Sequence, residues 1–157
     1  MTSSKVQTKT MKVTTRDLKK LNPLREASPK KDEFRSLKKK DNFSYTSPDK
    51  KILETFDNPG GITTITLTCK EFTSLCPITG QPDFGEVGIK YGPNERCLEM
   101  KSLKLYINSY RMHGAFAEET ASRICVDLKK VLNPYWISIW VTFVSRGGVI
   151  IKAEVLG

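Results

Sequence analysis

The chain has 157 residues, with 26 Lys and Arg, 17 Asp and Glu, one His and four Cys, which suits one domain plus a surplus segment. The longest apolar run, Trp136 to Val144, is far shorter than the roughly 20 residues that span a bilayer. Without a Cys-x-x-Cys pair, neither a metal site nor a disulfide framework is indicated. We therefore expect a cytoplasmic protein with reduced thiols and no membrane contact.

Residues 1–51 hold 15 basic and 6 acidic residues, whereas residues 52–157 hold 11 of each. A basic segment with few apolar side chains is typical of a disordered extension. Such an arm suits RNA or an acidic surface, and a solvated tail without a partner explains it as well. We predict a folded domain over 52–157, with nucleic acid contacts, if any, only through 1–51.

Strand and helix patterns follow in chain order after the turn signal at 57–61. Residues 62–69 predict a strand that places Ile65, Leu67 and Cys69 on one face, and residues 84–91 predict a second strand. Apolar residues at helical spacing predict one helix around 103–110.

A second helix is predicted over 117–132, where Asn133-Pro134 stops it. Two strands at about 136–144 and 148–155, joined at 145–148, close the chain. The order strand, strand, helix, helix, strand, strand predicts an α+β fold, an antiparallel sheet with both helices on one face. The edges and the uncovered face of this sheet remain exposed, so we expect the chains to self-associate and bury them.

One predicted loop, residues 71–83, carries a thiol and a carboxylate seven positions apart, Cys76 and Asp83. A loop thiol acts as a nucleophile when neighbouring donors lower its pKa, and a nearby Asp can carry the proton. The alternative is a small apolar residue beside a turn and an Asp at the start of a strand. Cys69 and Cys125 fit packing roles.

Charged residues near the two helix starts suit ligand binding. Lys101 and Lys104 share a helix face and suit a phosphate near the helix start, although an ordinary solvated helix has the same pattern. Arg146 precedes Gly147 in a turn and suits a further phosphate contact, or simply a hairpin. Glu118 fits a first-turn acid or a carboxylate that reads ring N–H donors.

Four motifs occur in order over about residues 52–152 and together closely resemble the QueF family, the NADPH-dependent 7-cyano-7-deazaguanine reductases of queuosine biosynthesis. They are Phe72-Thr73-Ser74-Leu75-Cys76-Pro77-Ile78-Thr79-Gly80-Gln81-Pro82-Asp83-Phe84, Glu99-Met100-Lys101-Ser102-Leu103-Lys104-Leu105-Tyr106, Tyr110-Arg111-Met112-His113-Gly114-Ala115-Phe116-Ala117-Glu118 and Ser145-Arg146-Gly147-Gly148. The resemblance implies a tunnelling fold, in which ββααββ subunits form rings with active sites between subunits.

The resemblance also implies the chemistry. Cys76 would add to the nitrile of a deazaguanine base as a thioimide, Asp83 would act as acid and base, and two hydrides from NADPH would give the amine. The implied cofactor residues are Lys101, Ser102, Lys104, Arg146 and Gly147. The implied substrate residues are Leu98, Glu99, Met100, Phe116, Ala117 and Glu118.

Three positions depart from the family pattern: Ala117 stands where His is usual, Met100 where Ser or Leu is usual, and Thr120 where many relatives have a second cysteine. Two other functions remain open at this point. A relative on the same scaffold forms an amidine from a nitrile in tRNA without NADPH, and a catalytically silent assembly or tRNA-binding module is a different class. Lys101, Ser102, Lys104 and Arg146 favour the reductase.

Overall fold

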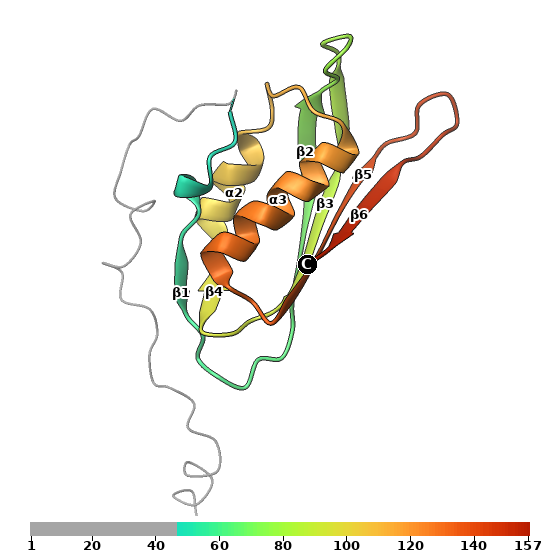
Figure 1. Cartoon of the computed structure of the whole chain (residues 1–157). Helices are drawn as coiled ribbons and strands as arrows, with labels where there is room; N and C mark the ends of the chain where they lie inside the picture. Colours follow the sequence, from blue (N-terminus) through green and yellow to red (C-terminus); the bar gives the residue numbers. More distant parts are fainter. Residues whose placement is uncertain (1–46) are drawn as a thin grey trace, which may run out of the picture.

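The computed structural model describes residues 47–157 (Figure 1). Most of the predicted extension, residues 1–46, lies outside the described residues. The described part opens with a 3-10 turn, η3 (Lys50–Ile52), which begins where the Asp49 carboxylate accepts a hydrogen bond of 2.9 Å from the Lys51 amide. The predicted start of the domain at residue 52 thus falls inside this turn.

The main sheet has four antiparallel strands in the order β2-β3-β5-β6. Their bounds are β2 (Ile65–Leu75), β3 (Pro82–Gly92), β5 (Trp136–Phe143) and β6 (Lys152–Leu156). The β2-β3 and β5-β6 neighbours are hairpins, and β3 pairs with β5 across the helical segment. This arrangement confirms the predicted α+β fold with an antiparallel sheet.

Two helices, α2 (Met100–Asn108) and α3 (Ala117–Leu132), cover the same face of this sheet (Figure 1). The predicted bounds of α3 are confirmed because Asn133 takes a left-handed conformation, φ 44°, and Pro134 cannot continue the backbone ladder. The helix α2 ends at Asn108, so the predicted helix around 103–110 ran two residues too far.

The core lies between the helices and the sheet. Alternate strand residues, such as Val87 and Ile89 on β3 and Ile139 and Val141 on β5, are fully buried there. The helix α3 contributes Ile124, Leu128 and Leu132 at helical spacing, also fully buried. The opposite face carries two indoles: an added Cβ at Gly92 would meet the Trp136 ring, and one at Gly88 would overlap the Trp140 ring.

Two expectations about the strands were wrong, and a bulge in β2 was not predicted. The predicted loop over 71–83 is largely strand, because β2 runs to Leu75 and β3 begins at Pro82, which leaves 76–81 as the connection. A bulge between Cys69 and Phe72 shifts the register and turns Phe72 and Ser74 toward the helices. The last strand begins at Lys152 and not at 148, since residues 146–149 form the tight turn.

A second, two-stranded sheet was not predicted. It joins β1 (Thr55–Asp57) to β4 (Arg96–Leu98). Strands of three residues are too short to show an alternating pattern. This sheet buries Cys97, which is 1% exposed, and it leads directly into α2.

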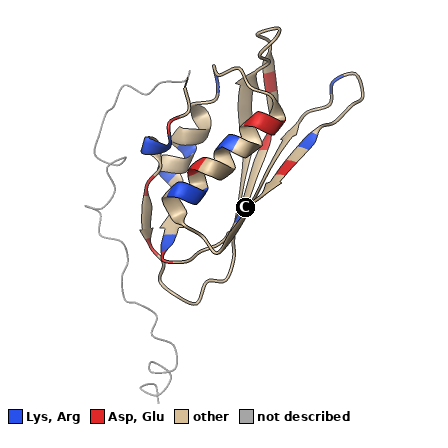
Figure 2. Cartoon of the chain, in the orientation of Figure 1, with Lys and Arg blue, Asp and Glu red and all other residues tan. Residues whose placement is uncertain are grey.

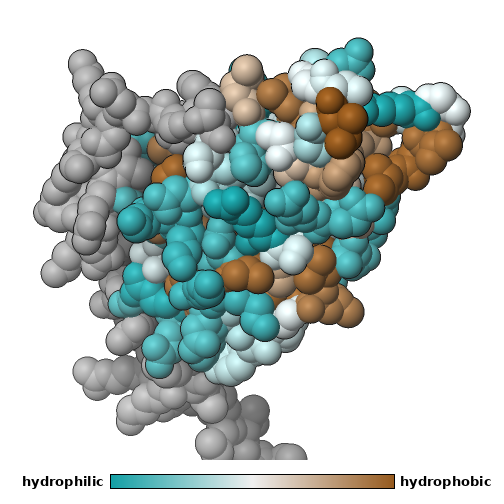
Figure 3. Space-filling view, turned by 45° about the horizontal axis from the view of Figure 1, so that its top comes forward, coloured by the Kyte–Doolittle hydropathy of each residue, from teal (hydrophilic) through white to brown (hydrophobic). Residues whose placement is uncertain are grey.

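The surface of the described part mixes both signs of charge, with acids and bases interleaved along α3 (Figure 2). Exposed apolar side chains gather around the connection between β5 and β6, where Val144, Val149 and Ile150 are more than half exposed (Figure 3). Within residues 47–157, no helix combines the length and apolar character that crossing a membrane requires.

Candidate active site

A cavity of about 270 Å³ lies where the β2-β3 connection, the start of α3 and the β5-β6 connection meet. It brings together the sequence-predicted residues Cys76, Asp83, Glu118 and Arg146. The remaining lining residues are apolar: Phe116, Ala117, Phe143, Val144, Val149 and Ile151. A thiol and three charged groups thus share one largely apolar cavity.

Backbone hydrogen bonds fix Cys76 in this cavity. The Leu75 amide donates to the His113 carbonyl at 3.0 Å, and the Ala115 amide donates to the Leu75 carbonyl at 3.2 Å. The end of β2 is therefore joined to the segment that enters α3. The Cys76 amide and carbonyl also bond to Gln81 and Gly80 at 2.8 and 2.9 Å, which closes the turn.

The Cys76 thiol is unusually acidic. Hydrogen bonds from the Thr79 hydroxyl, from the Thr79 and Ile78 backbone amides and from Arg146 lower its pKa from the ordinary 9.0 to about 7. Burial instead raises the pKa of the other three thiols, Cys69, Cys97 and Cys125. All four cysteines are free, so Cys76 is the one with thiolate character near neutral pH.

Thr79 was not singled out from the sequence, and its role gives a prediction. In Thr79→Val the thiolate loses its strongest donor, so we expect the midpoint of Cys76 alkylation by iodoacetamide to move from near pH 7 toward pH 9. The measurement is the alkylation rate against pH, followed by peptide mass. The Thr73→Val variant, at a half-buried position of β2 that supplies no donor to the thiol, should keep the wild-type midpoint. An unmoved midpoint in Thr79→Val would contradict this assignment.

Asp83 is the second predicted catalytic residue, and its side chain is only 8% exposed. Its carboxylate forms an ion pair with the half-exposed Arg146 guanidinium. Across the sheet its register partner is Ser74, whose hydroxyl is fully buried and has no hydrogen-bond partner among the described residues. Ser74 is a further polar group beside the site that sequence reasoning did not single out.

Glu118 lies at the rim of the cavity, in the first turn of α3. The residue before the helix, Phe116, supplies no side-chain hydrogen bond to it, so backbone N–H groups at this end are free to favour anions. Ala117 is buried and lines the cavity without a polar group. Glu118 is therefore the carboxylate that α3 offers to a ligand.

The second predicted group, Leu98 to Lys104, is not part of this cavity. The Leu98 amide donates to the Tyr91 hydroxyl at 3.0 Å, and Tyr91 lies eight residues beyond Asp83 on β3. At about 3.3 Å per residue, Asp83 and Tyr91 stand roughly 25 Å apart at opposite ends of one strand, and Leu98 lies beside Tyr91. One chain does not bring them together.

The start of α2 also differs from the expectation of an anion site. The Glu99 carboxylate accepts hydrogen bonds from the Lys101 and Ser102 amides at 2.8 and 2.6 Å, so these donors are occupied. The Ser102 hydroxyl is buried, donates to the Glu99 carbonyl at 2.8 Å and accepts from the Glu54 amide at 3.0 Å. Ser102 thus has a structural role in this chain.

The side chains of Met100, Lys101 and Lys104 are exposed. Met100 and Lys104 line a groove of about 600 Å³ between α2 and β2. Two ammonium groups on one helix face suit the phosphates of a dinucleotide, so these lysines fit that part of the prediction through their side chains alone.

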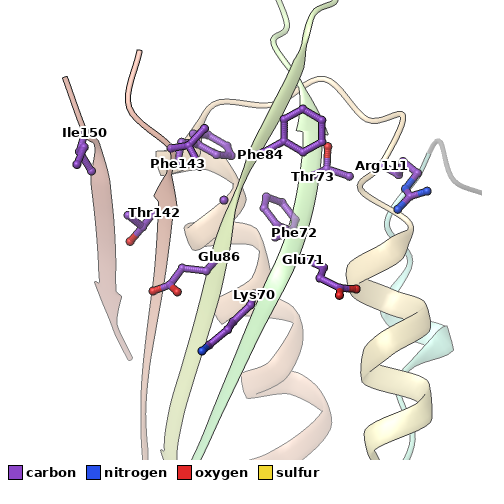
Figure 4. Close-up of a pocket in the computed structure, with 12 residues that line it drawn as sticks. Lys70, Glu71, Phe72, Thr73, Phe84, Glu86, Arg111, Thr142, Phe143 and Ile150 are labelled. Carbon is purple, nitrogen blue, oxygen red and sulfur yellow. The ribbon is translucent and has the colours of Figure 1, made fainter. Parts of the chain in front are cut away.

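Figure 4 shows a larger cavity, of about 780 Å³. It adjoins the Cys76 cavity at the end of β5, since Phe143 and Val144 line both. It runs across β2, β3 and β5 and contains Phe72, Phe84 and Glu86, but neither Cys76 nor Asp83. Among residues 47–157, no three His, Cys, Asp or Glu side chains are placed to hold a metal ion.

The four-stranded sheet is covered by two helices and has an acidic thiol at one end. These features define the class of protein: an α+β protein of the tunnelling fold with a cavity built around a cysteine. The crystal structure of an archaeosine synthase QueF-Like in the apo form has the same fold. Its TM-score is 0.59 at 24% identity, and the match covers 62% of this chain and 96% of that one.

Sequence comparison identifies the family. A family model described as QueF-like protein matches residues 82–156. A protein of Helicobacter acinonychis (strain Sheeba), named NADPH-dependent 7-cyano-7-deazaguanine reductase, is 53% identical over 112 residues, which cover 70% of this chain and 74% of that one. A Streptococcus thermophilus protein (strain ATCC BAA-491 / LMD-9) of the same name is 50% identical over 109 residues, 68% of this chain and 65% of that one. The chain belongs to the QueF family of enzymes.

Proposed function

We propose that this protein is a nitrile reductase that converts 7-cyano-7-deazaguanine to 7-aminomethyl-7-deazaguanine with two NADPH, a step toward queuosine in tRNA. The observation that carries the proposal is the acidic thiol of Cys76 in one cavity with Asp83. The names of the curated relatives support the same substrate and cofactor. The reaction would take place in the cytoplasm.

The first step is capture of the nitrile. The Cys76 sulfur attacks the nitrile carbon, a C–S bond forms, and one π bond of the C≡N group breaks as the nitrogen takes a proton. With a pKa of about 7, about half of the Cys76 side chains are thiolate at neutral pH. The nitrogen takes this proton from solvent, because a carboxylate paired with a guanidinium, as Asp83 is with Arg146, is ionised.

Reduction then proceeds at the captured carbon. NADPH, when bound, supplies one hydride in each of two rounds. The first round also consumes one proton, which Asp83 is placed to deliver to the nitrogen. The C–S bond then breaks, which returns the Cys76 thiolate and leaves an iminium, and the second hydride adds to its carbon without a further proton. Atoms balance as one nitrile, two NADPH and two protons giving one amine and two NADP⁺. Lys101, Lys104 and Arg146 would hold the cofactor phosphates.

A test of this function mixes the protein with NADPH and the free nitrile base and follows cofactor oxidation by absorbance. We expect oxidation only when the base is present. In the amidine-forming alternative, the nitrile in tRNA is consumed with a nitrogen donor and NADPH is unchanged. A silent module would show neither reaction.

Glu118 is expected to read the guanine-like edge of the base. In Glu118→Ala the ligand's N–H donors lose a charged acceptor, which costs on the order of 1–3 kcal/mol, so affinity for the nitrile base should fall at least about tenfold. Glu118→Gln keeps one acceptor, so its affinity for the base should lie between those of the wild type and Glu118→Ala. Calorimetry measures each affinity.

The matched control is Glu119→Ala, which removes the neighbouring exposed carboxylate in the same helical turn but does not touch the cavity. It should bind like the wild type. If Glu118→Ala binds the base as tightly as wild type, the carboxylate does not read the substrate.

The complete site is proposed to form between subunits. In one chain, Leu98 at the start of the lysine group is roughly 25 Å from Asp83, and neither Lys101 nor Lys104 lines the Cys76 cavity. A second copy that places its α2 start against that cavity would complete the site. Exposed apolar side chains around the β5-β6 connection offer a surface for such a contact (Figure 3).

Mixing variants tests the shared site. Cys76→Ala and the double variant Lys101→Ala/Lys104→Ala should each lack turnover, and subunit exchange between them should restore activity because mixed oligomers contain one intact site. Differently tagged chains report whether mixed oligomers form. Mixed oligomers without activity would contradict a site built from two subunits.

A further inference from the structure

Arg146 occupies a position that its predicted role at a cofactor phosphate does not explain. Its guanidinium pairs with the Asp83 carboxylate, and Nη2 also donates to the Pro82 carbonyl at 3.4 Å. The Arg146 side chain is 51% exposed, whereas the Asp83 side chain is 8% exposed. A side chain that reaches in from solvent therefore covers the candidate catalytic acid.

The backbone at Arg146 is held by the turn, whereas the side chain is held only by its contacts with Asp83 and Pro82. The Arg146 amide donates to the Val149 carbonyl at 2.9 Å, and the Val149 amide donates back at 3.0 Å. Gly147 and Gly148 have φ of 56° and 83°, a conformation that glycine adopts without strain. The tight turn thus fixes the position of the Arg146 backbone, and the four side-chain torsions of Arg146 set the position of its guanidinium.

The same guanidinium touches both candidate catalytic groups. It pairs with Asp83, and it is among the donors that lower the pKa of the Cys76 thiol. The charged side chains around Cys76 are Asp83 from β3, Glu118 from α3 and Arg146 from the β5-β6 connection. Arg146 is the cation among them.

If the proposed function holds, the Arg146 guanidinium cannot keep its contacts with Asp83 and Cys76 and also bind a cofactor phosphate. The reducing ring of a dinucleotide must lie against the carbon captured by Cys76, and its phosphates are at least one ribose away from that ring. A guanidinium seated on Asp83 beside Cys76 is therefore at the ring position and must turn outward to meet a phosphate. Both anions suit the same planar fork of donors.

We propose that Arg146 is shared between two states: it pairs with Asp83 beside Cys76 in the cofactor-free enzyme, and a bound cofactor phosphate draws it away. Thiol addition then belongs to the cofactor-free state, where Arg146 stabilises the Cys76 thiolate. Cofactor binding frees the Asp83 carboxyl for proton transfer during reduction. Arg146 thereby becomes a catalytic residue for capture and a binding residue for the cofactor.

Because binding linkage is reciprocal, removing the Asp83 charge should strengthen cofactor binding. We expect Asp83→Asn to bind NADP⁺ about fivefold tighter or more, at the lower end of ordinary coupling effects because Arg146 is half exposed. The measurement is calorimetry with NADP⁺, which binds without reducing anything. Asp83→Ser provides a second neutral variant, and thermal unfolding reports whether each variant is folded.

Two controls separate competition from a general effect of charge. Glu118→Gln removes another carboxylate from the same cavity and should change NADP⁺ affinity less than about twofold. In an Arg146→Ala background, Asp83→Asn should no longer tighten NADP⁺ binding, because the competing pair is already absent.

The outcomes distinguish this proposal from the proposed function. If wild type binds NADP⁺ and both neutral Asp83 variants bind it no tighter, the competition is wrong and the reductase function stands. If Asp83→Asn raises NADP⁺ affinity equally in the wild-type and Arg146→Ala backgrounds, the proposed competition is also wrong. If wild type does not bind NADP⁺ at all, both the cofactor assignment and the competition fail.

Discussion

Replacing Cys76 with alanine is expected to abolish both turnover and the covalent adduct with the nitrile base. The lowered pKa of this thiol makes it the thiolate present at neutral pH, and no other described nucleophile in the cavity has comparable reactivity. Intact-protein mass measures the adduct, and NADPH absorbance measures turnover. We expect an adduct of one base per chain in wild type and none in Cys76→Ala.

Cys69→Ala is the matched control, because it removes a half-buried thiol on β2 whose pKa is raised by burial. It should keep the adduct and the turnover. A Cys76→Ala protein that still forms the adduct would eliminate Cys76 as the nucleophile.

The second large effect concerns stability, at Gly85 in the middle of the sheet. Gly85 pairs with Phe72 on β2 and with Phe143 on β5. A Cβ there would overlap the Thr142 carbonyl oxygen and lie 3.0 Å from the Phe143 Cα, and these are backbone atoms between two paired strands. Gly85→Ala should therefore lower the free energy of unfolding by about 3 kcal/mol or more, measured by urea denaturation.

Gly114→Ala is the comparison. Its added Cβ would lie 3.3 Å from the Pro77 Cα in a connection between elements, where a shift of a few tenths of an ångström relieves the contact. We expect a loss below about 1 kcal/mol. A Gly85→Ala protein as stable as wild type would show that β3 and β5 separate more easily than their pairing implies.

The fold could be predicted where the spacing of apolar residues and the residues that end an element point to the same bounds. The helix α3 has apolar residues at helical spacing and Asn133-Pro134 at its end, and its bounds are confirmed. The strand β2 was underestimated because the bulge after Cys69 interrupts its alternation, so Phe72 and Ser74 did not look like inward-facing strand residues. Bulges are set by pairing with a partner strand, which a single segment does not reveal.

The site could be predicted less fully than the fold. The Cys76 and Asp83 spacing and the family resemblance indicated which residues to compare, and the structure places both in one cavity with Glu118 and Arg146. The Thr79 hydroxyl as donor to the thiol depends on a turn geometry that sequence does not state. The distance between Asp83 and Leu98 depends on their being at opposite ends of β3, which only the register establishes.

The most direct test of a reductase that works through Cys76 is a chase of the captured nitrile. The protein is first mixed with the base alone, its intact mass is recorded, and NADPH is then added while mass and released product are followed. We predict that the adduct forms without cofactor, disappears on addition of NADPH and yields one amine for every two NADPH oxidised. An adduct that persists, or that releases unchanged nitrile with no NADPH oxidised, would contradict the proposed function.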